Sequence, residues 1–146
     1  MAHTDTFADT DKLRGPVTVA DGEVRLVGAR CDSCTTHAFP LQANCPRCGR
    51  SMSAIHLPAI GTVWSWTVQR VRPKPPFEGP DEFEPFAVGY VDVGPVRVEA
   101  RLEGKPVGEW RIGDTVHLVA GAADANGDVW SYRFEATEDA TPGGGT

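Results

Sequence analysis

The sequence lacks several features that would assign it to a broad class of protein. It has no run of about eighteen apolar residues, so no membrane-spanning helix is predicted. Residues 1–10 lack the basic start and apolar stretch of a signal peptide, so we expect a cytoplasmic protein. Basic residues are few: 14 Lys and Arg face 20 Asp and Glu, for a formal net charge of −6. This balance disfavours general nucleic-acid binding, which depends on neutralising phosphates.

The common catalytic motifs are also missing. We find no nucleophile motif, no glycine-rich phosphate loop before a helix, and no His-Glu pair on a helix. Asp81, Glu82 and Glu84 cluster in a proline-rich loop, where a carboxylate pair could perform acid–base chemistry. A solvated acidic loop is the favoured interpretation, because nothing nearby predicts burial. The chain is therefore predicted not to be catalytic on its own.

What the sequence does contain is typical of a mainly β protein. Its 16 Gly and 12 Pro favour many short strands over long helices. Alternating patterns predict one early strand and then five more, over residues 23–30, 61–72, 86–93, 96–102, 115–120 and 129–136. Asn126-Gly127 is a hairpin-turn signal before the last strand. Five strands with a long first one fit a small Greek-key barrel such as the OB-fold, although an SH3-like barrel or an open sandwich would give the same pattern.

All four cysteines lie in two Cys-x-x-Cys pairs, Cys31/Cys34 and Cys45/Cys48, separated by ten residues. Each pair can form a knuckle, a tight turn that directs two thiolates at one metal ion while backbone N–H groups donate to sulfur. Two disulfides or a redox pair are alternatives, which the absence of an export signal disfavours. The pattern predicts a closed, structural zinc site, and iron would fit the same sulfurs geometrically.

The residue after each cysteine pair differs between the two knuckles. Gly49 supplies a permissive backbone after the second pair, whereas Thr35 stands at the corresponding place after the first and is expected to strain its turn slightly. The histidines His37, His56 and His117 are interpreted as ordinary polar or half-buried residues, because four cysteines already fill the site.

Two further patterns could bind a ligand. Arg70, Arg72 and Lys74 recur at every second residue, so on a continuing strand they would share one face and could hold a phosphate group. A solvated strand end is the favoured interpretation. Trp64 and Trp66 are predicted to share one face, where they could stack on a base but are better explained as core or subunit interface.

The order of these features resembles a family of small OB-fold proteins with a rubredoxin-like zinc ribbon, formerly a domain of unknown function. The resemblance covers about residues 22–136. It is carried in the ribbon by GEVRL (22–26), RCDSC (30–34), FP (39–40) and CPRCG (45–49). In the barrel it is carried by GTVWSWTV (61–68), PPF (75–77), PFAVGYV (85–91) and IGDTV (112–116).

The composition of the two ends predicts a flexible segment over residues 1–21 and a disordered tail over 138–146. The resemblance implies a zinc ribbon over 22–58 and an OB-fold barrel over 59–137. It implies a non-catalytic accessory subunit that stabilises a thiolase-superfamily or related acyl-CoA enzyme, such as a thiolase, aldolase or acyltransferase. Zinc on Cys31, Cys34, Cys45 and Cys48 is the implied cofactor. Contact of Arg70, Arg72, Lys74 and Phe77 with acyl-CoA is a hypothesis of ours, and a nucleic-acid-binding OB-fold module is the alternative function.

Overall fold

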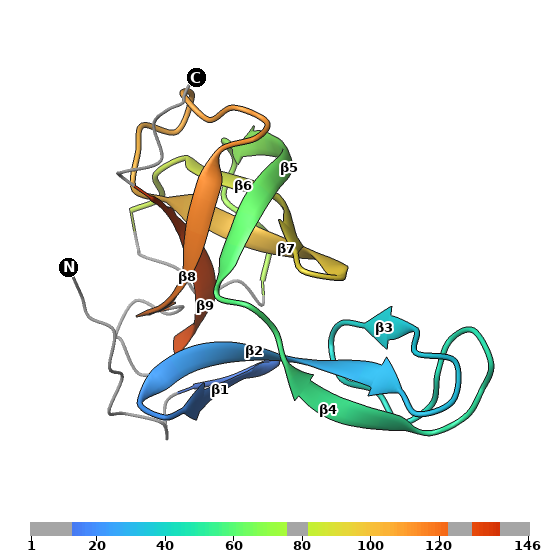
Figure 1. The fold of residues 1–146 in the computed structure, drawn as a ribbon. Helices are drawn as coiled ribbons and strands as arrows, with labels where there is room; N and C mark the ends of the chain where they lie inside the picture. Colours follow the sequence, from blue (N-terminus) through green and yellow to red (C-terminus); the bar gives the residue numbers. More distant parts are fainter. Residues whose placement is uncertain (1–12, 76–81, 123–129, 138–146) are drawn as a thin grey trace.

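The structure is a computed structural model, and it describes residues 13–75, 82–122 and 130–137. These residues contain nine β-strands and no helix, and therefore none long and apolar enough to cross a bilayer. The strands form a small sheet at one end and a closed barrel at the other (Figure 1). The small sheet contains β1 (Val17–Ala20), β2 (Glu23–Cys31), β3 (His37–Ala38) and β4 (Met52–His56). The barrel contains β5 (Ile60–Gln69), β6 (Phe86–Val93), β7 (Val96–Glu103), β8 (Thr115–Ala122) and β9 (Trp130–Ala136).

The small sheet is built around β2. Its first half pairs with β1, and its second half pairs with both β3 and β4. The strand β1 lies in the segment 1–21, for which the sequence predicted no strand. The physical reason for this strand is that Val17 and Val19 lie opposite Leu26 and Val24, which gives this short segment backbone partners and an apolar face to cover.

The five remaining strands close into a barrel in the order β5-β6-β7-β9-β8. All neighbours are antiparallel except β7 and β9, which run parallel with Leu102 opposite Phe134. The prediction of a mainly β protein, with a cysteine-bearing ribbon followed by a five-stranded barrel, is confirmed. Closure through β5–β8 pairing leaves the barrel with no free edge at this point and decides against an open sandwich.

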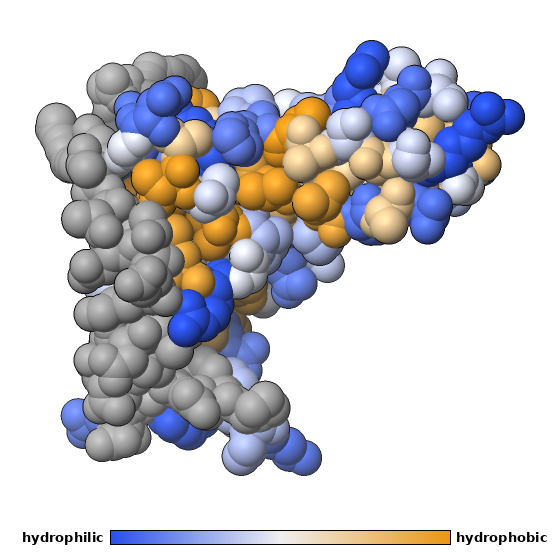
Figure 2. All heavy atoms as spheres, turned by 90° about the horizontal axis from the view of Figure 1, so that it is seen from below, coloured by the Kyte–Doolittle hydropathy of each residue, from blue (hydrophilic) through white to orange (hydrophobic). Residues whose placement is uncertain are grey.

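A single hydrophobic core joins the two parts. Val24, Leu26 and Leu57 of the ribbon belong to the same buried cluster as Val91 and Phe134 of the barrel. Seen from below, hydrophobic residues gather on the side of β1, β2 and β4 and extend toward the arm that carries the ribbon tip (Figure 2). The ribbon is thus anchored on the barrel through its inner half, while its tip projects.

The strand β5 carries a β-bulge that corrects the prediction for its tryptophans. The pairing register with β6 shifts between Val63 and Ser65, so Trp64 is an extra residue without a direct partner. As a result Trp64 is exposed on the outside, whereas Trp66 packs against the core cluster. The two rings therefore do not share one face, because one extra residue in the strand reverses the alternation of the side chains after it.

Several sequence-based predictions fall outside the described residues. These are the flexibility of residues 1–12, the position of Phe77, the turn at Asn126-Gly127 and the disorder of residues 138–146.

Candidate metal centre

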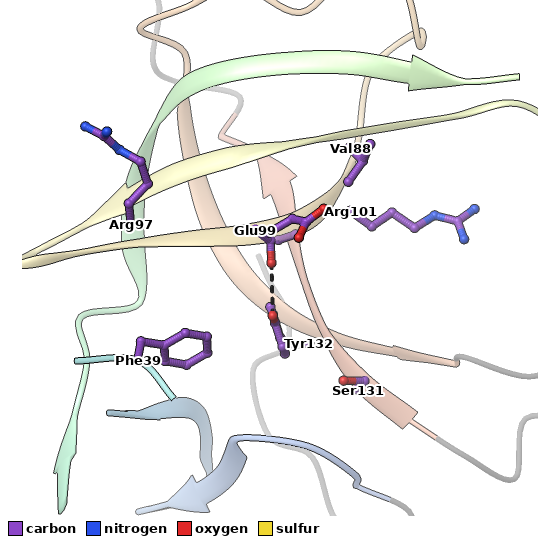
Figure 3. Close-up of a pocket in the computed structure, with 8 residues that line it drawn as sticks. Phe39, Val88, Arg97, Glu99, Arg101, Ser131 and Tyr132 are labelled. Atoms are coloured by element: carbon purple, nitrogen blue, oxygen red, sulfur yellow. Dashed lines mark hydrogen bonds between the residues drawn. The ribbon is translucent and has the colours of Figure 1, made fainter. Parts of the chain in front are cut away.

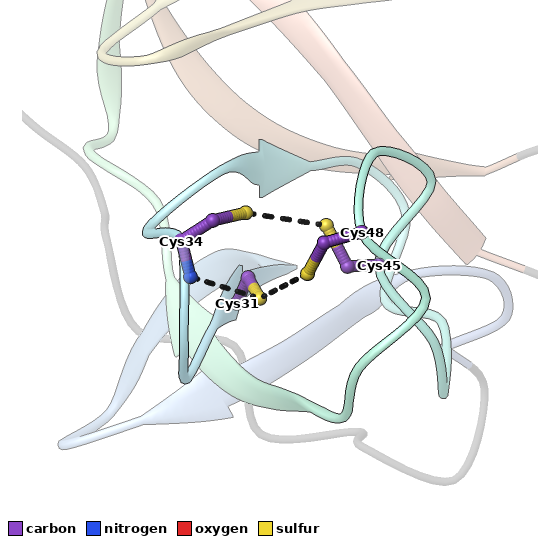
Figure 4. A group of neighbouring side chains, drawn as sticks. All are labelled: Cys31, Cys34, Cys45 and Cys48. Carbon is purple, nitrogen blue, oxygen red and sulfur yellow. Dashed lines mark hydrogen bonds between the residues drawn. The ribbon is translucent and has the colours of Figure 1, made fainter.

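The four cysteines come together at the outer end of the ribbon (Figure 4). Cys31 is the last residue of β2, and Cys34 lies in the turn that follows. Cys45 and Cys48 lie in the loop that precedes β4. The Sγ atoms of Cys31 and Cys48 are 3.5 Å apart, those of Cys34 and Cys45 are 3.7 Å apart, and all four lie within 4.8 Å of one another.

Backbone N–H groups point at the sulfurs in both knuckles. The N–H groups of Ser33 and Cys34 donate to Cys31 Sγ, each at 3.4 Å, and the N–H of Arg47 donates to Cys45 Sγ at 3.3 Å. Such bonds favour the thiolate form, which is the form that binds metals. The first knuckle is tied to the residue before β4 by the N–H of Asp32, which donates to the carbonyl of Ser51 at 3.2 Å.

The geometry suits one tetrahedral metal ion. A tetrahedron with metal–sulfur bonds of about 2.3 Å has edges of roughly 3.8 Å, close to the two short sulfur–sulfur distances. The same distances exceed the bond of a disulfide, and all four cysteines are free. The structure therefore does not show the disulfide alternative, which the sequence had already disfavoured. The cluster is suitable for a metal ion, and four sulfur ligands leave no open position for water or substrate.

The thiols differ in their tendency to ionise. Hydrogen bonds from the hydroxyl and the backbone of Thr36 lower the pKa of Cys34 to about 6. Burial raises the pKa of Cys45, but the N–H groups of Cys48 and Arg47 outweigh it and leave that pKa below its ordinary value. The N–H of Arg50 lowers the pKa of Cys48. The Cys31 sulfur and burial raise this pKa by more than that, so the net result is a pKa of about 11. The surroundings thus favour ionisation of Cys34 and Cys45 and disfavour ionisation of Cys48.

Residues outside the cysteine motif support it, and sequence reasoning missed them. The Thr36 hydroxyl lies 3.1 Å from Cys34 Sγ. The Asp32 carboxylate accepts hydrogen bonds from the hydroxyls of Ser51 (3.2 Å) and Ser53 (2.6 Å), which ties the first knuckle to the start of β4. Thr36 could have been suspected because it stands two residues after a ligand, but the partners of Asp32 are about twenty residues away and only the fold brings them close.

The two knuckle turns bear out the predicted contrast between Thr35 and Gly49. Both residues adopt left-handed backbone conformations, with φ of 63° and 80°. A β-branched residue is strained there, by about 1–3 kcal/mol, whereas Gly is not. Thr35→Gly is therefore expected to stabilise the metal-loaded protein by about 1 kcal/mol, since part of the relief is offset by the freedom of Gly in the unfolded chain.

Gly49→Ala is the matched change in the opposite direction. A Cβ at Gly49 would meet nothing within 4 Å, so its cost is purely conformational and of about the same size. Urea unfolding of the metal-loaded protein measures both, and a Thr35→Gly variant less stable than the parent would contradict the assignment of strain.

The structure places the other predicted candidates away from the cysteines. Within the described part of the chain, the metal-ligand cluster contains no histidine. His37 lies half-buried in β3, and His56 is exposed at the end of β4. His117 contacts Thr137 (3.2 Å) and Glu135 (3.4 Å) on the barrel.

The basic residues Arg70, Arg72 and Lys74 are exposed but do not lie on a continuing strand, because β5 ends at Gln69. Its last pair is Gln69 with Phe86, and the residue before Phe86 is Pro85, which has no N–H to extend the ladder. The strand predicted over residues 61–72 therefore ends earlier than expected, and the condition under which the three bases would share one face is not met. Phe77 lies outside the described residues.

A cleft of about 530 Å³ lies between the ribbon and the barrel (Figure 3). Phe39 of the ribbon meets Tyr132 of β9 edge to face, with ring centroids 6.1 Å apart. The Tyr132 hydroxyl donates to the carbonyl of Glu99 at 2.9 Å, and burial raises the pKa of this tyrosine. The cleft lining combines aromatic, basic and acidic side chains, and no Cys, His or Lys is among them; it consists of Phe39, Val88, Arg97, Glu99, Ala100, Arg101, Ser131 and Tyr132. This wall stabilises the joint between ribbon and barrel and shows no nucleophile paired with a base.

Comparisons of sequence and structure show which known proteins this chain is similar to. Residues 54–121 match the sequence model described as "ChsH2, C-terminal OB-fold domain". The match starts inside β4 and ends inside β8. A DUF35 domain-containing scaffold protein of Methanocaldococcus jannaschii is 29% identical over 124 residues, which are 78% of this chain and 83% of that protein. A solved structure described as an Ltp2-ChsH2(DUF35) aldolase contains a chain that is 29% identical, with a TM-score of 0.62 over 77% of this chain and 84% of that one.

Proposed function

Because residues 54–121 match the sequence model of a ChsH2-type C-terminal OB-fold domain, we propose that this chain is a non-catalytic accessory subunit of a thiolase-fold acyl-CoA enzyme. The enzyme partner would be a thiolase, aldolase or acyltransferase, and the small subunit would stabilise it. The observation that carries this proposal is the similarity to the DUF35 chain of an aldolase complex, which extends over 77% of this chain and so includes more than the barrel. The M. jannaschii relative is a scaffold protein, which supports the same role.

The metal in this proposal is zinc on Cys31, Cys34, Cys45 and Cys48. The four-sulfur donor set and the near-tetrahedral spacing support zinc, because structural zinc sites almost always have four ligands in tetrahedral geometry. The ion would supply no reaction chemistry, because no ligand position is open. It would hold the ribbon in the shape that a partner recognises. Free thiols of this kind favour a reducing, cytoplasmic location.

The test of the proposal is reconstitution with a defined partner. The chain is co-expressed with the thiolase-fold subunits of its own genome, one at a time, and each mixture is examined by size-exclusion chromatography with light scattering. We expect one of them to co-elute at fixed stoichiometry and to gain activity or solubility from the complex. Failure of every thiolase-fold subunit to bind, with the chain folded and monodisperse by itself, would refute the accessory role.

The basic segment Arg70, Arg72 and Lys74, with Phe77, is our candidate for contact with the CoA moiety of the substrate. Three exposed cations within five residues can neutralise phosphates. Replacing the three bases by Ala is expected to weaken acyl-CoA binding by the complex by roughly tenfold, about 1.4 kcal/mol, without affecting assembly. Isothermal titration with CoA measures this, and replacing the distant Arg14 and Arg50 by Ala is a charge control. Unchanged affinity in the triple variant would remove this segment from the CoA site.

A further inference from the structure

Four of the six large hydrophobic side chains that are exposed in the described part of the chain lie on β5, on its partner strand β6, or in a loop that is bonded to β5. Ile60 and Trp64 point outward from β5, and Tyr90 points outward from β6. Ile112 belongs to the loop before β8, where the N–H of the next residue donates to the carbonyl of Val63 at 2.8 Å. Ile112 is 72% exposed and Ile60 is 55% exposed. We call these four side chains the apolar barrel face.

The fold holds this face in place. Trp64 is the extra residue of the β-bulge, and bulges redirect side chains in this way. Its ring meets the ring of Tyr90 edge to face, with centroids 6.2 Å apart, and the Arg97 guanidinium lies 3.8 Å over it. Trp, Tyr and Arg are the residues most enriched at the energetic centres of protein interfaces. Here they are pre-arranged, so little conformational entropy would be lost on binding.

The charges around this face indicate what it binds. Arg97 is already paired with Asp92 at 2.7 Å, and Glu99 lies opposite Tyr90 on β7. With the exposed Arg111 beside Ile112, two cations stand against two carboxylates, so this face has no excess of positive charge to bind a nucleic acid, even though two aromatic rings are exposed. The balanced charges and the exposed apolar side chains complement an apolar protein surface with little net charge.

We propose that the apolar barrel face is the docking surface for the enzyme subunit of the complex, which covers Ile60, Trp64, Tyr90 and Ile112 with apolar side chains. This inference rests on the proposed accessory function and adds to it the surface that binds. It places the contact on the outside of β5 and β6, distinct from the ribbon tip and from the basic segment at residues 70–74.

The test compares pairs of variants in the reconstituted complex. The probe is the thiolase-fold subunit that co-elutes with the unmodified chain. Ile112→Glu is matched with Val71→Glu, because both side chains are 72% exposed and only the first lies on the face. Ile60→Glu is the second variant on the face. We expect the two face variants to weaken binding by roughly 30-fold or more, and Val71→Glu by less than about twofold, in surface plasmon resonance without CoA.

The outcomes separate this inference from the proposed function. If the unmodified chain binds the subunit and both face variants bind equally well while remaining folded by circular dichroism, the docking surface is wrong and the accessory role stands. If the unmodified chain binds no thiolase-fold subunit, the accessory role and the docking surface are both refuted. If a single-stranded oligonucleotide quenches the fluorescence of Trp64 and the signal is lost in Trp64→Ala, the face is a base-stacking surface and the inference is overturned.

Discussion

Replacing Cys45 by Ser is expected to abolish stoichiometric metal binding and to unfold the ribbon. Cys45 is buried, its Sγ lies 3.7 Å from that of Cys34, and its backbone N–H donates to the carbonyl of Arg50 at 2.7 Å. The ribbon tip has little apolar core of its own, so the metal supplies much of its folding free energy, on the order of 10 kcal/mol in isolated zinc peptides. Metal content by mass spectrometry under native conditions should fall from one ion per chain to near zero.

The effect should also reach the barrel, because Leu26 and Leu57 of the ribbon belong to the shared core. We expect a lower melting temperature and faster amide hydrogen exchange over β2, β3 and β4. His37→Ala is the matched control, since His37 lies in the same ribbon but does not belong to the cysteine cluster. A Cys45→Ser variant with full metal content and unchanged melting would contradict the metal centre.

Metal loading should depend on pH in a defined direction. In the metal-free protein Cys48 keeps its proton up to a pH of about 11, whereas Cys34 loses its proton above about 6. Binding at neutral pH must therefore displace at least the Cys48 proton, and the apparent affinity falls as the pH is lowered. Below about pH 6 the Cys34 proton must be displaced as well, so the fall becomes steeper. Chelator competition over roughly pH 5 to 8 measures both changes, because this range lies on either side of the Cys34 pKa of about 6.

The second large effect is expected from Gly89→Ala. Gly89 lies opposite Trp66, next to the bulge in β5. A Cβ at this position would lie 2.3 Å from the carbonyl oxygen of Ser65 and 3.1 Å from the Cα of Trp66. Both are backbone atoms, so the two strands must separate to admit one methyl group. We expect a loss of about 3 kcal/mol or more in the free energy of unfolding, measured by urea denaturation.

Gly108→Ala is the control for this change. Gly108 lies in the connection between β7 and β8, and a Cβ there would meet nothing within 4 Å. Its replacement is expected to change stability by less than about 0.5 kcal/mol. If Gly89→Ala were equally harmless, the close approach of β5 and β6 at the bulge would not be a feature of the folded protein. If its stability fell while Trp64 fluorescence kept its native spectrum, the bulge itself would be retained.

Features that depend on local spacing could be read from the sequence. Two residues between cysteines close a turn whichever fold surrounds it, so the pairing of Cys31 with Cys34 and of Cys45 with Cys48 was predictable. The barrel strands were also predictable, because side chains alternate between core and solvent along each of them. The choice of metal is not decided by either, since the same four sulfurs accept zinc or iron.

Tertiary structure decided the features that depend on a partner strand. The segment Val17–Ala20 is a strand only because Val24 and Leu26 lie opposite it, and β5 ends at Gln69 because Pro85 cannot extend the pairing. Trp64 and Trp66 face opposite ways because the register with β6 shifts between them. The sequence by itself thus determined the cysteine site and the strands, whose patterns are local along the chain. Only the tertiary structure decided the apolar barrel face, because cross-strand register and loop contacts bring residues from three separate segments together.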